Sequence, residues 1–233
     1  MRHYEELLAP VYSWMMGDLP AAFARSRDIL RAAGLGGGKD TVVDLGAGFG
    51  LQSIPLAEAG YDVAAIDTSR LLLDELGLRE PRVRRVLADL REFRRHVAGP
   101  CQGVVCMGDT LPHLPGKDDV AQVIDEAAGA LAPGGRLVLG FRDYTVAREG
   151  TDRFIPVRSD ADRILTCFLE YQPDHVDVHD VLHERQGQTW SMRVSAYRKL
   201  RLDPAWVAER LRARGLQVAE PSAPGQALLV GVR

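Results

Sequence analysis

Hydrophobic positions follow two different periods between Thr41 and Tyr144. Short apolar runs predict buried strands, and they alternate with segments whose apolar residues recur every three or four positions, which predict amphipathic helices. This repeated alternation is typical of a doubly wound, parallel α/β sheet. The predicted strands are 41–46, 61–69, 83–90, 103–109 and 136–144, and the predicted helices are 51–60, 70–78 and 118–135.

The pattern changes on both sides of this region. Residues 1–38 predict two helices, the first interrupted at Pro10, and these either cover one face of the sheet or form a lid over a ligand. After Tyr144 the apolar residues alternate with period two, which predicts two or three antiparallel strands inserted after strand five. The inserted strands fall within 161–173, 174–187 and 188–202, followed by a helix at 204–216 and a closing antiparallel pair at 217–223 and 226–233.

We therefore expect one α/β domain over residues 1–233, built on a seven-stranded, mostly parallel sheet. A chain of 233 residues is long enough for one such domain with an insertion. The expected parts are a helical cap (1–38), a cofactor-binding core (41–144), an antiparallel insertion (145–202), and a last helix with the closing strand pair (203–233).

Composition excludes several classes of partner. Hydrophobic residues make up 46% and charged residues 26%, as in ordinary globular proteins. A net charge of −3 gives no general electrostatic reason to bind nucleic acid or an anionic membrane, so we expect neither. We find no signal-peptide pattern at residues 1–10 and no apolar run of membrane-spanning length, so we expect a cytoplasmic protein, either a monomer or a homodimer.

Potential metal ligands are also present. Cys101 and Cys106 lie in an apolar run and are expected in the core. His175, His179 and His183 are interleaved with acids, but in an extended strand the outer two lie about 26 Å apart at about 3.3 Å per residue. We therefore expect a polar sheet face there and no metal site.

A glycine-rich segment, Val42–Gly50, contains the strongest chemical signal. Its strand leads through Asp44 into a loop with glycine at every second position and then into a helix, an arrangement that brings backbone close to a ligand. The spacing differs from the dinucleotide fingerprint G-x-G-x-x-G, whose turn holds a pyrophosphate. The Asp44 carboxylate suits a ligand that carries an ammonium group. A glycine-rich turn without a ligand is the alternative. The loop glycines are Gly46, Gly48 and Gly50.

Acidic residues end the next two predicted strands. Ligands of open α/β sheets bind beyond the carboxyl ends of the strands, at the switch point. Asp67 is placed to accept hydrogen bonds from both hydroxyls of a ribose. Asp89 is placed to accept one from an adenine amino group, while the Leu90 amide donates to a ring nitrogen. Either acid alone is also consistent with a surface turn.

Several of these segments resemble a known family. The Asp-x-Gly-x-Gly-x-Gly loop resembles motif I of class I S-adenosylmethionine (SAM)-dependent methyltransferases, and the resemblance extends over about Thr41–Tyr144. Met107–Leu114, MGDTLPHL, resembles the motif IV region of small-molecule methyltransferases and lacks the Asn/Asp-Pro-Pro-Tyr motif of enzymes that methylate bases or glutamine amides. The insertion with its YRKLRL segment also resembles glycine/sarcosine and amino-sugar N-methyltransferases.

The resemblance implies a Rossmann-like methyltransferase fold and a set of site residues. The implied cofactor is SAM, with S-adenosylhomocysteine as product, and no metal is implied. His113 is either a general base or a binding contact. The implied cofactor contacts are Asp44, Gly46, Ala47, Gly48, Gly50, Asp67, Thr68, Asp89, Leu90, Met107, Gly108 and Tyr12. The candidate substrate contacts are Tyr4, Trp14, Arg142 and Tyr144.

The resemblance also implies the reaction, which is direct SN2 transfer of the sulfonium methyl group to an N, O or possibly S atom of a small-molecule acceptor. Two further functions remain open at this point. One is a non-enzymatic SAM-binding or regulatory protein, and the other is an NAD(P)-dependent Rossmann oxidoreductase, which the glycine spacing disfavours. A methyltransferase acting on protein or RNA is a third alternative, and it should show an open or basic substrate groove.

Overall fold

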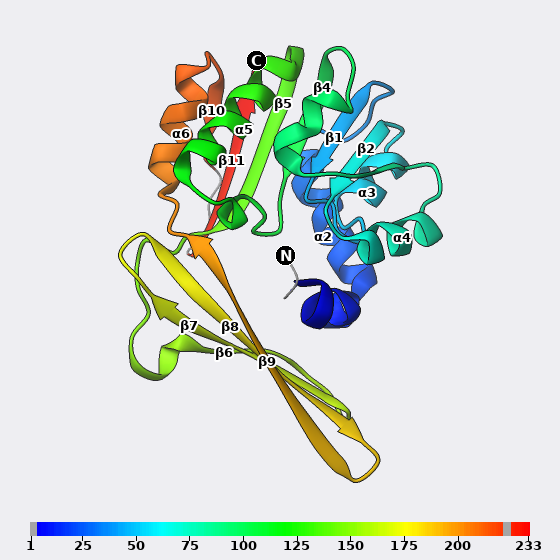
Figure 1. The fold of residues 1–233 in the computed structure, drawn as a ribbon. Coiled ribbons are helices and arrows are strands. Elements are labelled where there is room, and N and C mark those ends of the chain that lie inside the picture. Colours follow the sequence, from blue (N-terminus) through cyan, green and yellow to red (C-terminus); the bar gives the residue numbers. More distant parts are fainter. Residues whose placement is uncertain (1–3, 221–224) are drawn as a thin grey trace.

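Two sheets organise the chain, which the computed structural model describes over residues 4–220 and 225–233 (Figure 1). The larger sheet has the strand order β10-β11-β5-β4-β1-β2-β3, and the smaller has the order β6-β7-β8-β9. The strands of the larger sheet are β1 (Thr41–Leu45), β2 (Asp62–Asp67), β3 (Arg84–Leu87), β4 (Cys101–Cys106), β5 (Leu131–Arg142), β10 (Gln217–Ala219) and β11 (Gln226–Val232).

The larger sheet is mostly parallel, as the sequence predicts. Strands β1 to β5 are parallel, whereas β11 pairs antiparallel with β5 and β10 pairs antiparallel with β11. Strand β1 pairs with both β2 and β4, so the chain reverses its direction of travel across the sheet at β1. This switch point is where an open α/β sheet binds its ligand.

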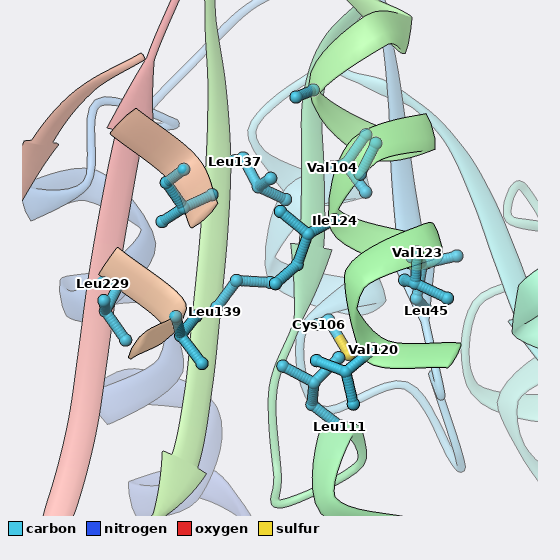
Figure 2. Packing of buried hydrophobic residues seen from close by; sticks show 14 of the residues in the cluster. Leu45, Val104, Cys106, Leu111, Val120, Val123, Ile124, Leu137, Leu139 and Leu229 are labelled. Atoms are coloured by element: carbon cyan, nitrogen blue, oxygen red, sulfur yellow. The ribbon is translucent and has the colours of Figure 1, made fainter. Parts of the chain in front are cut away.

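Helices cover both faces of the larger sheet. Because side chains alternate along a strand, Val43 and Leu45 of β1 face one helical layer and Val42 faces the other. Figure 2 shows one of these layers, in which Val120, Val123 and Ile124 of α5 lie over β4 and β5. The helices are α2 (Leu19–Ala32), α3 (Ser53–Glu58), α4 (Arg70–Arg79), α5 (Lys117–Ala130) and α6 (Pro204–Ala213), with the 3₁₀ segments η3 (Leu90–Arg95), η4 (Leu111–His113) and η5 (Gly150–Arg153).

Local capping explains where several helices begin. Asp18, Ser69 and Asp203 precede α2, α4 and α6, and each side chain accepts a hydrogen bond from a backbone N–H of the first turn. These bonds satisfy donors that the helix itself leaves without a partner. None of the helices in the described part of the chain is long and apolar enough to span a membrane.

The insertion forms a four-stranded antiparallel sheet, one strand more than the sequence predicts. Its strands are β6 (Phe154–Ser159), β7 (Arg163–Tyr171), β8 (His175–Gln186) and β9 (Thr189–Leu200). The additional strand, β6, contains Pro156, and its register with β7 shifts between Pro156 and Arg158. Proline cannot donate to the ladder and is tolerated on edge strands, and β6 is an edge. Pro156 therefore obscures the period-two pattern in the sequence.

The N-terminal segment divides into two parts with different roles. Helix α2 covers one face of the larger sheet through Leu30, which packs with the residues of β1 and α3. The turns before it are a π-helical turn (Tyr4–Leu8), a 3₁₀ turn (Ala9–Val11) and α1 (Tyr12–Met15). They lie at the end of the larger sheet where the inserted sheet also lies (Figure 1). Helix α2 therefore has the predicted face-covering role. For the turns before it, a lid over a ligand stays a prediction.

Polar contacts hold these N-terminal turns on two sides. The Ser13 hydroxyl donates to Glu75 of α4. The Trp14 Nε1–H donates to Asp160, beside the β6–β7 turn, at 2.5 Å. The Arg158 and Arg163 guanidinium groups lie 5.5 and 5.7 Å from the centre of the Trp14 ring. These N-terminal turns therefore connect helix α4 to the inserted sheet.

Candidate functional site

The loop after β1 has the backbone that its glycines predict. Gly46, Gly48 and Gly50 have φ values of 74°, 53° and 97°, in the left-handed region that side-chain-bearing residues avoid. A Cβ atom at Gly46 would also overlap the Thr110 side chain, in the loop after β4. The glycine loop and the β4 loop are therefore in direct contact at the switch point, and Ala47 lies buried between the first two glycines.

Asp44 is a buried carboxylate with one oxygen left unpaired. Its side chain is 1% exposed, and Oδ2 accepts a 2.6 Å hydrogen bond from the Ser53 hydroxyl of α3. Oδ1 has no hydrogen-bond partner among the described residues. Burial raises the pKa of Asp44 to about 7, with the Ser53 hydrogen bond opposing the shift and the Asp67 charge adding to it. An ammonium group presented to Oδ1 would satisfy that oxygen and favour the ionised form.

Asp67 connects strand β2 to the glycine loop. Its Oδ2 accepts from the Gly48 N–H at 2.8 Å and its Oδ1 from the Ser69 N–H at 2.7 Å. Burial raises the pKa of Asp67, and these backbone donors oppose the shift. Each carboxylate oxygen retains a second lone pair that a ribose hydroxyl can use. Thr68, the next predicted contact, is exposed.

Asp89 is held by Arg91, a residue that the sequence analysis does not identify as part of the site. Arg91 donates to it from its backbone N–H at 2.9 Å and from its guanidinium group at 2.7 and 3.1 Å. The same guanidinium group pairs with Asp119 of α5 at 2.7 Å. The hydrogen bond that Asp89 accepts from the Arg91 side chain lowers the pKa of Asp89. The predicted adenine contact therefore requires Asp89 to share its oxygens with Arg91, and half-buried Leu90 begins η3 beside it.

The loop after β4 contains a residue under backbone strain. Met107 is half-buried and lies against Gly140 of β5, and Gly108 is exposed with a φ of 69°. Asp109 follows with a φ of 72°, the only side-chain-bearing residue with a left-handed backbone in the described part of the chain. Such strain persists only where surrounding contacts compensate it, and it concentrates at functional sites.

Those contacts come from both sheets. Asp109 is 8% exposed and accepts from the Arg142 N–H at 3.0 Å and from the Tyr144 hydroxyl at 3.0 Å. Lys199 of β9, itself 7% exposed, forms an ion pair with it. Burial alone would raise the pKa of Asp109, but the Lys199 charge lowers it below its ordinary value. The pair ties the inserted sheet to the strand ends of the larger sheet.

Sequence reasoning missed both Asp109 and Lys199. The sequence offers one indication that Asp109 is a site residue, since it lies at the end of a predicted strand within the segment that resembles motif IV. The indication for Lys199 is weaker, since it is only the single lysine of the insertion. Their pairing joins residues 90 positions apart and depends on the tertiary structure.

His113 lies at the interface between the β4 loop and the inserted sheet. It ends η4, its side chain is exposed, and its ring stacks on Tyr197 of β9 with centroids 5.1 Å apart and planes 17° apart. Lys199 Nζ lies 5.4 Å from the centre of the same Tyr197 ring. His113, Tyr197, Lys199 and Asp109 therefore form one polar cluster beside the glycine loop.

The remaining predicted contact residues lie in different parts of the structure. Tyr12 packs against Phe49 of the glycine loop with ring centroids 5.9 Å apart, which brings it beside that loop. Trp14 instead faces the inserted sheet. Arg142 is exposed at the end of β5, and Tyr144 is 3% exposed, with its hydroxyl bonded to Asp109. The side chain of Tyr4 lies outside what the structure describes.

The histidines of β8 lie on the outer face of the inserted sheet. His175 contacts Asp174 at 2.6 Å, and His179 contacts Glu170 at 3.3 Å. The extended strand that the sequence predicts is confirmed here. Residues 4–220 and 225–233 contain no group of three or more His, Cys, Asp or Glu side chains that could hold a metal ion.

Comparison with known proteins identifies the relatives of this chain. Residues 42–135 match a family model described as a methyltransferase domain. The glycine/sarcosine N-methyltransferase of Aphanothece halophytica is 32% identical over 111 residues, which are 46% of this chain and 42% of that protein. That of Parasynechococcus marenigrum (strain WH8102) is 30% identical over 145 residues, or 60% and 50%. The chain thus spans about half the length of these relatives.

Solved structures match over nearly the whole chain. The CcbJ methyltransferase from Streptomyces caelestis has a TM-score of 0.79 at 21% identity and covers 98% of this chain and 97% of its own. CalS10, an amino pentose methyltransferase from Micromonospora echinaspora solved with SAM bound, has a TM-score of 0.77 at 18% identity, with the same coverage. At such identities the likeness establishes the fold.

Removal of the Lys199 charge should destabilise the fold. Lys199→Met leaves the buried Asp109 carboxylate without its cation, and we expect the free energy of unfolding to fall by about 3–5 kcal/mol. Urea denaturation measures this change. Lys39→Met, at an exposed position, is the matched control. A loss no larger than that of the control would contradict the proposed role of the ion pair.

Asp44 should make stability fall as pH rises. Its pKa is about 7 in the folded protein against an ordinary 3.8, so between these values the unfolded chain binds fewer protons and stability declines, levelling off above pH 7. From pH 4 to pH 8, wild type should lose on the order of a few kcal/mol more than Asp44→Asn. Urea denaturation at several pH values measures the difference, with exposed Asp62→Asn as control. Parallel wild-type and Asp44→Asn curves would contradict it.

Proposed function

We propose that this chain transfers the sulfonium methyl group of SAM to an N or O atom of a small-molecule acceptor. The premise is its fold, which is that of the class I SAM-dependent methyltransferases, together with the match of residues 42–135 to a methyltransferase domain. We further propose that residues 1–233 act as one methyltransferase unit. In this unit the core (41–144) binds the donor, and the cap with the insertion (145–202) encloses the acceptor.

The unpaired oxygen of Asp44 is the observation that carries this proposal. A buried carboxylate beside a glycine loop requires a donor, and the amino acid portion of SAM offers an ammonium group. Gly46 and Gly48 leave room for backbone to lie against the ligand. A pyrophosphate at the same place would meet the Asp44 charge at close range, which disfavours a dinucleotide.

The other strand ends supply the proposed contacts for the rest of SAM. Asp67 binds the ribose hydroxyls through the lone pairs that its backbone donors leave available. Asp89 and the Leu90 amide face the adenine, and Met107 with Gly108 lies beside the sulfonium. Tyr12, packed on Phe49, presents an aromatic face to the same end of the site.

The protein contributes alignment and exclusion of water to the proposed reaction. SAM supplies an electrophilic methyl group with a neutral leaving group, so the protein must mainly hold the reacting atoms about 3–3.5 Å apart in line. The cap and the inserted sheet both lie over this end of the larger sheet (Figure 1), which suits an enclosed small acceptor. The matched relatives named as glycine/sarcosine N-methyltransferases support a small acceptor.

Isothermal titration tests the donor site directly. We expect SAM to bind and NADH not to bind. Asp67→Ala should weaken SAM binding by roughly 10- to 150-fold, because the loss of a charged hydrogen bond costs roughly 1.5–3 kcal/mol. Asp62→Ala, at the exposed start of the same strand, is the control. NADH binding without SAM binding would disprove the proposed function, and unchanged SAM affinity in Asp67→Ala would disprove the placement of the ribose.

His113 should affect turnover more than donor binding. Its ring stacks on Tyr197 of the inserted sheet, so His113→Ala should lower kcat/KM by about tenfold or more, with SAM affinity nearly unchanged. Release of S-adenosylhomocysteine measures turnover, and exposed His96→Ala is the control. Equal losses of turnover and SAM affinity would instead assign His113 to the donor site.

A further inference from the structure

The inner face of the inserted sheet carries one polar row between two apolar clusters. Alternate residues of β8 are buried, namely Val176, Val178, Asp180 and Leu182. Antiparallel pairing places Cys167 of β7 and Ser195 of β9 opposite Asp180, on the same face. Toward the cap, Leu182 packs with the N-terminal turns, and toward the larger sheet, Val176 and Val178 pack with Tyr144. Asp180 is thus an acid in the middle of a buried apolar face.

One oxygen of this buried carboxylate has no partner. Asp180 is 4% exposed, and Oδ2 makes no hydrogen bond within the described residues. Tyr197 and Cys167 hydrogen-bond to the carboxyl group, and the positive charges facing it are Lys199 and Arg142. Lys199 is already paired with Asp109. A buried oxygen left unsatisfied costs about 1–3 kcal/mol, which a ligand donor would recover.

Asp180 belongs to the same cluster as the proposed reaction site. Tyr197, which bonds to it, stacks on His113 of the β4 loop. Lys199, which faces it, pairs with Asp109 at the end of β4. The β4 loop in turn contacts the glycine loop through Thr110. The β4 loop therefore connects the inserted sheet, which carries Asp180, to the glycine loop, which follows Asp44.

We propose that Asp180 receives the amino nitrogen of the methyl acceptor and takes a proton from it, so that the acceptor is a primary or secondary amine. This inference rests on the proposed methyl transfer. An amine is bound as its ammonium form, which offers N–H donors and a positive charge to the unpaired oxygen. A hydroxyl offers the donor without the charge and would leave the Asp180 charge uncompensated.

Methyl transfer to the amine includes one proton transfer to Asp180. The acceptor ammonium gives one proton to an Asp180 oxygen, which leaves a neutral amine and a carboxylic acid. The nitrogen lone pair forms a bond to the methyl carbon while the carbon–sulfur bond breaks, and the electron pair of that bond stays on sulfur. The product is an N-methylated ammonium together with S-adenosylhomocysteine, and Asp180 then returns its proton to solvent.

Burial makes Asp180 a suitable base for an amine. Desolvation raises the pKa of Asp180 to about 6, with Lys199, Tyr197, Cys167 and Arg142 opposing the shift. Inside the protein the neutral pair of amine and carboxylic acid also needs less solvation than the ion pair, which favours the proton transfer. An alcohol is far too weak an acid to lose its proton to such a carboxylate.

Matched amines and alcohols test the inference. With saturating SAM, we would compare glycine with glycolate, benzylamine with benzyl alcohol, and glucosamine with glucose, and measure release of S-adenosylhomocysteine. We expect turnover with an amine and none with its alcohol partner.

The Asp180→Asn variant tests the residue itself. It should lower kcat/KM for that amine by about 100-fold, with SAM affinity unchanged. Wild-type kcat/KM should also fall as pH drops through about 6, a fall that Asp180→Asn should lack.

A second readout needs no turnover. The amines should raise the Tm of the S-adenosylhomocysteine complex more than the alcohols do, and they should not raise that of Asp180→Asn. Asn matches the shape of Asp without a charge to bury, so this variant should fold. Asp177→Asn is the control, because Asp177 lies on the outer face of the same strand, 3.5 Å from His175.

The possible outcomes separate the two proposals. Turnover of an alcohol in place of its amine, or equal activity in wild type and Asp180→Asn, overturns the role of Asp180. So does a panel in which no amine is methylated and none raises the Tm of wild type above that of Asp180→Asn. If wild type does not bind SAM in isothermal titration, the proposed function itself fails.

Discussion

The buried ion pair between Asp109 and Lys199 is the interaction on which the site depends. It holds a strained loop at the end of β4 and joins the inserted sheet to the larger sheet. A charge buried without its partner is strongly destabilising, so the two sheets cannot separate here at low cost. Because the β4 loop also contacts Gly46, the same pair fixes the position of the inserted sheet relative to the glycine loop, and with it the proposed acceptor side relative to the proposed donor side.

Two buried carboxylates connected through this loop are incompletely satisfied. Asp44 and Asp180 each have one buried oxygen without a partner in the described residues, and burial raises the pKa of both. Isolated buried charges are rare in proteins unless a ligand or partner completes them. Two such oxygens fit two cationic groups, the ammonium of the donor and the ammonium of an amine acceptor. The methyl group would then move between two groups that are each held by a carboxylate.

Patterns within short segments of the sequence predicted most of the larger sheet, because strand burial and helix amphipathicity are local properties. They failed at β6, where Pro156 interrupts the alternation on an edge strand. The Asp44 loop was recognisable from glycine spacing, whereas Lys199 became visible only through a contact with a residue 90 positions away. The burial of Asp180 could have been predicted from the sequence, since Asp180 is in phase with Val178 and Leu182 and out of phase with the histidines.

A crystal structure of the complex with S-adenosylhomocysteine is the most direct test of the proposed donor site. We expect the ligand amino group to lie within hydrogen-bonding reach of Asp44 Oδ1, directly or through one water. Its sulfur should lie beside Met107 and Gly108, facing the cluster of His113, Tyr197 and Asp180. A ligand bound elsewhere, or in this loop with its amino group directed away from Asp44, would show that Asp44 does not hold the donor.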